Sequence, residues 1–376
     1  MYDMKEIYGK RRTAMTAWMA EHGISAVIFR DAEECRSPSV RYFTGQPADA
    51  TLVLAADGSS ILIPWDENMA RKMAFADTII PFTRYERNPV QAVAGALKKL
   101  KVPHHTKVEI PGTTTYPEFL HYVDSLSEYD VICRENGADV YATSLRAVKD
   151  AYEIECTRKA AAVTDALIDS LEAGVKDGTI TTETDAALLI ERECRKAGCE
   201  GTGFETLAAG PARSFGIHCF PPYTAGEFPA QGLSILDFGV VWQGYTSDVT
   251  LTFAKGPLTA GQEKQLELVQ KAYDESVPLY MKDIPVRAAA VKADEVFAAG
   301  KRSMPHSLGH GIGLECHEAP LVRPKTPAEE LLKPGMIVTC EPGLYDEELG
   351  GCRLENDILV TEEGNEVLTH ARIIRL

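Results

Sequence analysis

The residues of this 376-residue chain that could do chemistry are concentrated in its C-terminal half. Two pairs of acids stand in apolar, strand-like sequence, and the loop HSLGHGIGLECHE between them carries three histidines. The residues concerned are Asp237 and Asp248, then His306, His310 and His317, then Glu341 and Glu355. Four carboxylates and an imidazole brought to one place would repel one another unless a cation of charge two or more lay among them. The pattern therefore predicts a metal-dependent hydrolase.

The spacing of the acidic pairs predicts two β-hairpins. Asp237 and Asp248 fall symmetrically about residues 242–243, between the runs SILDFGVV and TSDVTLTF. A hairpin centred there, which turns through residues 243–244, would place the two aspartates directly opposite each other on antiparallel strands. Opposed Cβ atoms lie roughly 4.5–5.5 Å apart, so both carboxylates could hold one ion. Glu341 and Glu355 repeat the arrangement about the polar turn DEELGG. A single acid beside a turn is usually solvated, but two such pairs predict a nest of oxygen ligands large enough for two ions.

The histidine loop is predicted not to be helical. His306 and His310 have a helical spacing of four, but glycines at 309, 311 and 313 argue against a helix. A glycine-rich bend lets the backbone approach a ligand while the imidazoles point inward. One histidine alone is more often structural, but three so close together, in a chain with nine, favour a site.

These segments resemble the M24 metallopeptidases of the pita-bread fold, and most closely the Xaa-Pro peptidases, prolidase and aminopeptidase P. GHGIGLECHE, CEPGLY and GCRLEND are similar to the late motifs of that family, and LDFGVVWQGYTSDVTLTF to its early one. SLRAVKDAYEIECTRKAA resembles the helix that opens the catalytic domain. GFETLAAGPARSFGIHC resembles the segment with an additional active-site histidine, here His218, and RYFTG at 41–45 resembles part of the N-terminal domain of Xaa-Pro peptidases and creatinase.

The resemblance implies two divalent ions and assigns their ligands. Asp237 would bind one ion through both oxygens, Asp248 and Glu355 would bridge the two, and His310 and Glu341 would complete the second. A hydroxide held between the ions would attack the scissile carbonyl. Glu341 would also act as the acid/base that delivers a proton to the leaving nitrogen. Oxygen-rich sites with one imidazole suit manganese best, and cobalt, zinc and iron are compatible.

Four further residues are candidate catalytic groups. His317 or His218 would donate a hydrogen bond to the developing oxyanion, and His306 is expected to face the substrate. Arg353 lies two residues before Glu355 on the same strand face. It could pair with a ligand carboxylate or with a carboxylate of the substrate, and the sequence leaves both readings open.

Some positions of this sequence depart from the sequence pattern of the family that it resembles. The family usually has arginine where Leu251 follows Thr250, the segment around His218 follows the common pattern only loosely, and DEELGG is more acidic than expected. None of these departures removes a ligand, but each could alter substrate preference.

Thr250 and Thr339 share a strand face with a neighbouring ligand and are predicted to donate hydrogen bonds beside the site.

Length and element pattern predict two domains. We expect an α/β N-terminal domain of the creatinase/prolidase type over residues 1–140, for dimerisation or closure of the site. An α+β pita-bread catalytic domain with a curved antiparallel sheet would occupy residues 141–376. Apolar periodicity predicts strands at 25–29, 50–56, 60–65 and 106–110, and helices at 5–23, near 90–100 and 116–126, at 147–175 and 182–198, and near 260–282 and 286–300.

Composition and charge indicate the cellular compartment of the protein and exclude some classes of partner. No apolar stretch reaches 18 residues, so no transmembrane helix is expected, and the charged N-terminus lacks a signal core, which predicts a cytoplasmic protein. The net charge of −16 argues against nucleic acid or anionic membrane as partners. Nine cysteines without a CxxC pair indicate reduced thiols. Cys340 should face the core, whereas Cys219 and Cys316 could be oxidation-sensitive or could capture soft metals.

The predicted function is hydrolysis of the bond before proline. Such a bond is a tertiary amide whose ring blocks the strand-like docking that most proteases use. An Xaa-Pro dipeptidase is slightly favoured over an aminopeptidase because the chain is short. The alternatives are a metal-dependent amidase for a non-peptide small molecule and a non-catalytic peptide-binding module. The expected partners are a small proline-containing peptide and, by resemblance, a second copy in a homodimer.

Overall fold

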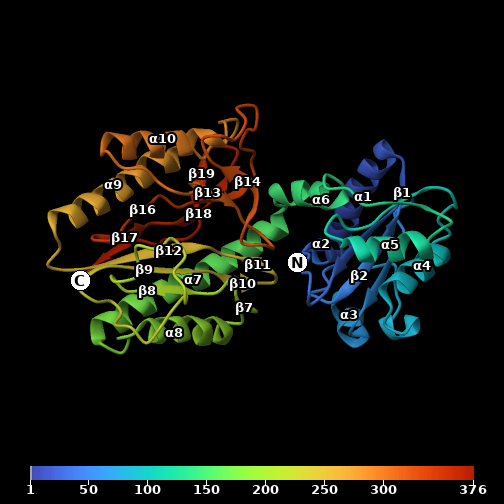
Figure 1. Ribbon diagram of the computed structural model, residues 1–376, viewed down its shortest axis with the longest axis horizontal. Helices are drawn as coiled ribbons and strands as arrows, with labels where there is room; N and C mark the ends of the chain where they lie inside the picture. Colours follow the sequence, from blue (N-terminus) through green and yellow to red (C-terminus); the bar gives the residue numbers. More distant parts are fainter. Residues whose placement is uncertain (1) are drawn as a thin grey trace. The chain divides into compact units, whose positions relative to one another are not determined.

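The computed structural model describes residues 2–376. The chain divides into two compact units, Met1–Arg146 and Ala147–Leu376, and each is described by itself (Figure 1).

The N-terminal unit is built on a six-stranded mixed sheet of order β4-β3-β2-β1-β5-β6. Strands β1, β2 and β3 are antiparallel, whereas β4 pairs parallel to β3, and β5 and β6 continue parallel from β1. The strands are β1 (Ile24–Asp31), β2 (Ala50–Ala55), β3 (Ser60–Pro64), β4 (Thr78–Ile79), β5 (Lys107–Glu109) and β6 (Asp130–Ile132). The central strands are buried almost throughout, as expected for a sheet covered on both faces.

Helices surround this sheet, and local sequence sets their ends. The Asp3 carboxylate accepts two backbone N–H groups at the start of α1, and Gly23 ends the helix with a positive φ of 63°. The helices are α1 (Met4–His22), α2 (Ser39–Thr44), α3 (Glu67–Met73), α4 (Pro89–Lys99), α5 (Tyr116–Ser125) and α6 (Ala138–Ala147). The predicted strands and helices of this unit are confirmed, with boundaries shifted by one or two residues.

The C-terminal unit combines four helices with several small sheets. In Figure 1, α7 and α8 lie on one side of the strands and α9 and α10 on the other, in agreement with their contacts. The helices are α7 (Ala151–Asp177), α8 (Glu183–Lys196), α9 (Ala260–Ser276) and α10 (Arg287–Ala299). The first strands are β7 (Gly201–Thr202), β8 (Leu207–Ala209), β9 (Gly232–Phe238), β10 (Val240–Trp242), β11 (Tyr245–Thr246) and β12 (Val249–Lys255). The later strands are β13 (Gly309–Gly311), β14 (Glu318–Val322), β15 (Ile337–Cys340), β16 (Gly343–Asp346), β17 (Gly350–Arg353), β18 (Asn356–Val360), β19 (Asn365–Val367) and β20 (Ile373–Arg375).

These strands form sheets of order β11-β10-β7, β20-β12-β9-β8, β14-β13-β15-β18-β19 and β16-β17. Apart from the parallel pair β12 and β20, their pairings are antiparallel. Leu251 and Cys340 are fully buried in the main core of the unit. The predicted inward orientation of Cys340 is confirmed, and Leu251 occupies a position that faces core rather than site.

Two predicted helix boundaries are wrong for local reasons. The helix expected from residue 147 begins at Ala151, because Asp150 and Glu153 form a capping box that fixes a new helix start. The helix expected to reach residue 282 ends at Ser276, because Pro278 follows and a short 3₁₀ turn replaces the α-helix.

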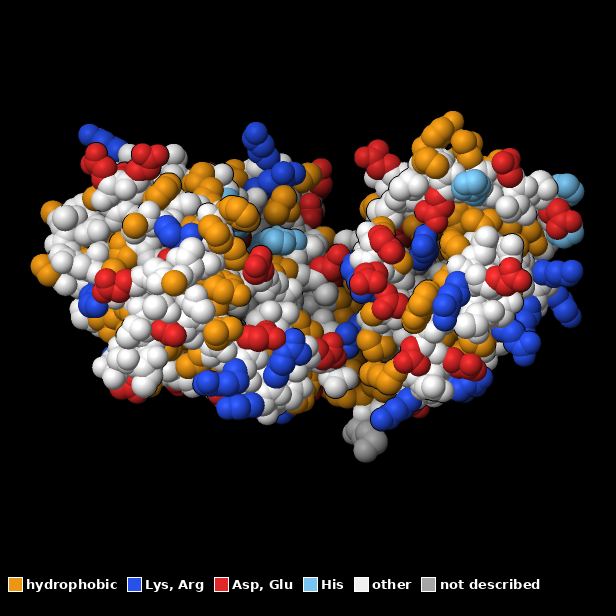
Figure 2. Space-filling model, turned by 60° about the horizontal axis from the view of Figure 1, so that its bottom comes forward, with side chains coloured by type: hydrophobic (Ala, Val, Ile, Leu, Met, Phe, Trp, Pro, Cys, Tyr) orange, Lys and Arg blue, Asp and Glu red, His pale blue; other side chains and the backbone are white. Residues whose placement is uncertain are grey.

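Acidic and basic side chains are interspersed on the face that Figure 2 shows, and histidines reach the surface of the C-terminal unit there. None of the helices formed by residues 2–376 combines the length and apolar character that a bilayer span requires.

Candidate metal centre

The first acidic hairpin has a different register from the one predicted. Strands β9 and β12 pair Asp237 with Thr250. A two-residue turn at 243–244, with positive φ at both positions, sets this register. Asp248 is therefore diagonal to Asp237 rather than directly opposite, and the prediction is wrong by two residues. Because side chains alternate with a period of two, the shift keeps both carboxylates on one face.

The second hairpin has the predicted register. β15 and β18 pair Cys340 with Asn356, and β16 and β17 pair Gly343 with Arg353. Glu341 lies between β15 and β16, and Glu355 lies between β17 and β18. The register that both strand pairs share therefore places Glu341 opposite Glu355. An antiparallel bridge between Thr250 and Glu355 then joins the second hairpin to the first.

All of the residues predicted for the site line one cavity of about 560 Å³. They are Asp237, Asp248, His310, Glu341 and Glu355, together with His218, His306, His317 and Arg353. The Nε2 atom of His310 lies 3.8 Å from Asp248 Oδ2 and 3.6 Å from Glu341 Oε1. Asp248, His310 and Glu355 each present a ligand atom within 4.8 Å of the others. The histidine loop is not helical, as predicted, because His310 lies on the short strand β13.

The carboxyl groups of this cluster outnumber the positive charge beside them, which is the guanidinium of Arg353. Burial and the neighbouring Glu355 raise the pKa of Asp248 and that of Glu341 well above their ordinary values. Burial and Asp237 raise the pKa of Glu355 to about 7. The Oδ1 atom of Asp237 is buried without a hydrogen-bond partner among the described residues. Divalent cations would supply both the missing charge and the missing partner, so these residues fit a metal centre.

His310 is prepared for the role of a neutral ligand. Burial lowers the pKa of His310 to about 4, so the ring is uncharged near neutral pH. Its Nδ1 lies 3.1 Å from the carbonyl oxygen of Gly311. That contact assigns the ring proton to Nδ1 and leaves the Nε2 lone pair directed at the carboxylates.

Arg353 binds the carboxylate of Asp237, a predicted ligand, which is one of the two interpretations that the sequence left open. Its Nη2 donates to Asp237 Oδ2 at 2.5 Å, and its Nε donates to the Thr250 hydroxyl at 2.8 Å. Its Nη1 donates to the Tyr345 hydroxyl at 2.8 Å and to the Ile217 carbonyl at 3.2 Å. The guanidinium thus holds the hairpins and the 217 segment around one buried charge.

The other three histidines of the cavity differ in how far they are buried. His306 is part-buried, with Nε2 3.0 Å from the Tyr345 hydroxyl and Nδ1 3.7 Å from Glu341 Oε2. Burial lowers the pKa of His306 to about 4. His317 and His218 are exposed, and burial together with His218 lowers the pKa of His317. These two imidazoles are therefore open to solvent.

The two threonines predicted to support the site contact residues predicted as ligands. The Thr250 hydroxyl donates to Glu355 Oε2 at 2.7 Å. The Thr339 hydroxyl also hydrogen-bonds Glu355, and its oxygen accepts the backbone N–H of His310 at 3.2 Å. Both predictions are confirmed. These bonds fix the orientation of the ligand carboxylate and of the histidine loop.

Sequence reasoning missed two residues beside the centre, Asp357 and Tyr345, and it missed the contact that Cys316 makes with Asp248. Asp357 Oδ2 accepts the backbone N–H of Asp248 at 3.0 Å, and its position two residues after Glu355 on one strand face was an available signal. Tyr345 hydrogen-bonds Arg353, and Cys316 donates from Sγ to Asp248 Oδ2 at 3.2 Å. Tyr345 and Arg353 lie eight residues apart on the paired strands β16 and β17, so the hairpin was an available signal, whereas Cys316 and Asp248 are 68 residues apart.

A buried ion pair holds the loop that carries Cys316 and His317. Lys149 Nζ lies 3.2 Å from Glu318 Oε2, and both side chains are 0% exposed. Glu318 Oε1 also accepts the backbone N–H groups of Leu314 and Glu315. The loop is therefore folded around the Glu318 carboxylate, immediately after His317.

Metal binding is expected to stabilise the protein more strongly as the pH rises. Without metal, carboxyls with raised pKa values stabilise the fold fully only below the unfolded value, near 4. That stability is lost as the pH rises toward the folded pKa, about 7 for Glu355. Metal ions need the deprotonated ligands, so their contribution changes in the opposite direction.

The measurement is the difference in Tm between manganese-loaded and chelator-treated protein. We expect a larger difference at about pH 7.5 than at about pH 5.5. An equal difference at both pH values would contradict the prediction. Glu348→Gln, at the exposed tip of the second hairpin, is a matched control that should preserve the pH dependence.

Comparison with known proteins gives matches in both units. The Creatinase/Prolidase N-terminal domain matches residues 11–127, and Metallopeptidase family M24 matches residues 155–362. The Xaa-Pro dipeptidase of Pyrococcus horikoshii is 25% identical, covering 97% of this chain and 98% of its own length.

Solved structures show the same two-domain fold. The Xaa-Pro dipeptidase from Bacillus anthracis superposes with a TM-score of 0.83 at 25% identity, covering 98% of this chain and 100% of that one. The X-Pro aminopeptidase from Thermotoga maritima also gives 0.83, at 22% identity, covering 97% and 99%. The predicted fold class is confirmed. Since the catalytic family matches more than half of the chain, this protein belongs to metallopeptidase family M24 and is an enzyme of that family.

Proposed function

We propose that this enzyme uses two divalent ions to hydrolyse the peptide bond that precedes proline, with Xaa-Pro dipeptides slightly favoured over longer peptides. The observation that carries the proposal is the single cavity into which every predicted site residue projects. Similarity to an Xaa-Pro dipeptidase over nearly the full length of both chains supports the substrate class.

Five residues would hold the ions, namely Asp237, Asp248, His310, Glu341 and Glu355. When bound, the ions supply Lewis acidity to the attacking water and to the scissile carbonyl. Arg353 orients Asp237 through its 2.5 Å contact and opposes the rise that burial causes in the pKa of Asp237. Thr250 and Thr339 orient Glu355. The protein residues thus define where charge can develop before any substrate enters.

Glu341 is the proposed acid/base. Burial and Glu355 raise its pKa, so its carboxyl group can accept a proton from water and release it again. The proline nitrogen has no N–H and must gain this proton as the carbon–nitrogen bond breaks. His306 Nδ1, 3.7 Å from Glu341 Oε2, lies beside the same carboxyl group.

The exposed histidines and an apolar wall would bind the substrate. An imidazole donates from a ring N–H in either protonation state, so His317 or His218 can hydrogen-bond the developing oxyanion. Apolar side chains that line the cavity offer surface for the pyrrolidine ring and for the residue before it. They are Phe204, Leu207, Ile217, Phe220, Pro222 and Leu321.

The test is hydrolysis of Xaa-Pro dipeptides and Xaa-Pro-Yaa tripeptides by chelator-stripped protein, with manganese, cobalt or zinc restored in turn. We expect metal-dependent cleavage of both, faster for dipeptides. Faster tripeptide cleavage would reverse the substrate preference. Absence of cleavage with two ions bound would exclude the proline assignment and favour a non-peptide amide. An Xaa-Ala dipeptide is the matched control substrate.

We also propose manganese as the working ion, because oxygen ligands dominate the site. The N-terminal domain, proposed to span residues 1–140, would form the contacts of a homodimer or close the site. The division of the chain after Arg146 supports a domain boundary in this region. The nine free thiols support a cytoplasmic location. Sedimentation of the full chain tests the dimer.

A further inference from the structure

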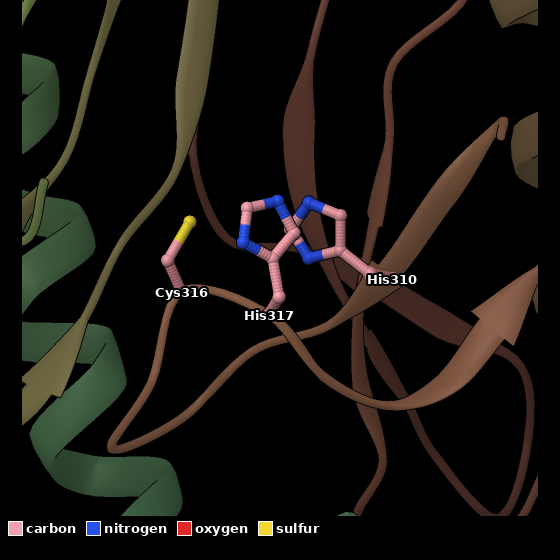
Figure 3. A group of neighbouring side chains, drawn as sticks. All are labelled: His310, Cys316 and His317. Carbon is pink, nitrogen blue, oxygen red and sulfur yellow. The ribbon is translucent and has the colours of Figure 1, made fainter. Parts of the chain in front are cut away.

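Cys316 brings a thiol into a group of imidazoles at the edge of the metal centre. Ligand atoms of His310, Cys316 and His317 all lie within 4.8 Å of one another. Figure 3 shows the three side chains gathered over the loop, with the His317 ring drawn between the other two. The sulfur also lies 3.2 Å from Asp248 Oδ2.

This donor set differs in chemistry from the proposed dinuclear centre. Four carboxylates and one imidazole suit a hard cation such as Mn²⁺, whereas a thiolate with two imidazoles suits a softer one. Two overlapping sets that share residues can therefore select different ions.

We propose that His310, Cys316 and His317, with Asp248 as the fourth ligand, form a second site for a soft divalent cation such as Zn²⁺ or Cd²⁺. The proposal rests on the proposed function in so far as both sites use His310 and Asp248. As the metal–sulfur bond forms, the thiol proton leaves to solvent and no oxidant or reductant is needed.

The distances permit this coordination with small movements. In a tetrahedral zinc site, bond lengths of about 2.0–2.3 Å place ligand atoms roughly 3.3–3.7 Å apart. The contacts of Asp248 Oδ2, at 3.2 Å to Cys316 Sγ and 3.8 Å to His310 Nε2, are already close to those values. The three pairs among His310, Cys316 and His317, each within 4.8 Å, need to close by about 1 Å, and the His317 ring has also to approach Asp248. His317 is exposed and the centroid of its ring lies 4.3 Å from that of the His310 ring, so the movement is a local rotation of an exposed side chain.

Because the soft-metal site and the dinuclear centre share ligands, the two sites compete for them. His310 and Asp248 cannot complete the soft site and the dinuclear centre at once. A zinc ion held by Cys316 therefore displaces an ion of the hydrolytic pair. Excess zinc is expected to inhibit an enzyme loaded with manganese, and removal of the sulfur to relieve that inhibition.

A simpler role for Cys316 is donation of a hydrogen bond to Asp248. Cys316→Ser separates the two roles, because a hydroxyl keeps the hydrogen bond and removes the soft ligand. Cys219 is a matched control. It also lines the cavity and is part-buried, but its thiol donates to the backbone carbonyl of Arg213 at 2.8 Å.

The experiment adds Co²⁺ or Cd²⁺ to the chelator-stripped full chain and records near-ultraviolet absorption, where thiolate-to-metal charge transfer appears. We expect the band in the unmodified protein and in Cys219→Ser, and its loss in Cys316→Ser. No band in the unmodified protein, survival of the band in Cys316→Ser, or its loss in Cys219→Ser would each overturn the proposal. If Cys316→Ser does not fold, as judged by far-ultraviolet circular dichroism, Cys316→Ala replaces it with the same expected outcome.

This readout needs no turnover. Failure of proline-peptide hydrolysis would therefore leave the soft-metal test intact. Full hydrolytic activity without a charge-transfer band would overturn the soft site alone.

Discussion

Asp248→Asn is expected to abolish metal binding and hydrolysis together, while the metal-free protein becomes at least as stable as the unmodified one. Asp248 is buried beside Glu355 and His310, and each of the three presents a possible ligand atom within 4.8 Å of the others. Without its charge the centre should lose affinity for divalent ions. We expect activity to fall by at least about 10³-fold, or roughly 4 kcal/mol of transition-state stabilisation.

The stability effect has the opposite sign for a physical reason. Burial and Glu355 raise the pKa of Asp248 well above its ordinary value, so its ionised form opposes folding near neutral pH. An amide removes that repulsion and can keep an acceptor for the Cys316 thiol, 3.2 Å away in the parent. Above the ordinary carboxyl pKa, the substitution therefore relieves an unfavourable charge.

Two measurements check this pair of expectations. Calorimetric titration with manganese should show loss of binding, and urea unfolding of the stripped protein should show no loss of stability. Glu348→Gln removes one carboxylate from the exposed end of the second hairpin and should leave both quantities unchanged. Retained metal binding with retained activity in Asp248→Asn would exclude the proposed bridging role.

Arg353→Met is expected to destabilise the protein by about 3–5 kcal/mol, because it breaks a buried ion pair from one side. Arg353 is 2% exposed, and the Asp237 carboxylate would lose its 2.5 Å partner. Thr250 and Tyr345 would lose hydrogen bonds at the same time. Arg353→Lys should recover only part of the loss, because an ammonium cannot reproduce a planar fork with four partners.

Urea unfolding of chelator-stripped protein measures the effect. Adding Asp237→Asn to Arg353→Met should restore part of the stability, since the unpaired buried charge is then absent. A loss below about 1 kcal/mol for Arg353→Met alone would show that the pair behaves like a surface salt bridge. In that case the cavity would have to be more hydrated than its burial indicates.

The two acidic hairpins show how far sequence reasoning reaches. Strand identity, the face on which each carboxylate lies and the opposition of Glu341 and Glu355 followed from alternation and symmetry. The register of the first hairpin did not. The two-residue turn at 243–244 fixes the pairing, and placing its centre one residue earlier moves Asp248 by two positions relative to Asp237.

The parts of the site that sequence could not predict are contacts between distant segments. The Cys316 thiol meets Asp248 across 68 residues of sequence, and Arg353 meets Asp237 across 116. Arg353 itself was predicted as a site residue, but its choice of partner depended on three-dimensional distance. Local pattern identifies which residue types can bind a metal, whereas packing decides which of them meet.

The buried pair of Lys149 and Glu318 links two stretches of chain that are 169 residues apart. Neither charge reaches water, so loss of either partner alone leaves the other buried at a cost of several kcal/mol. Natural lineages should therefore inherit the two residues together or replace them together. The same constraint applies to recombination between relatives. A hybrid enzyme whose crossover falls between positions 149 and 318 takes its lysine from one parent and its histidine loop from the other, and it remains compatible only where both parents carry the pair.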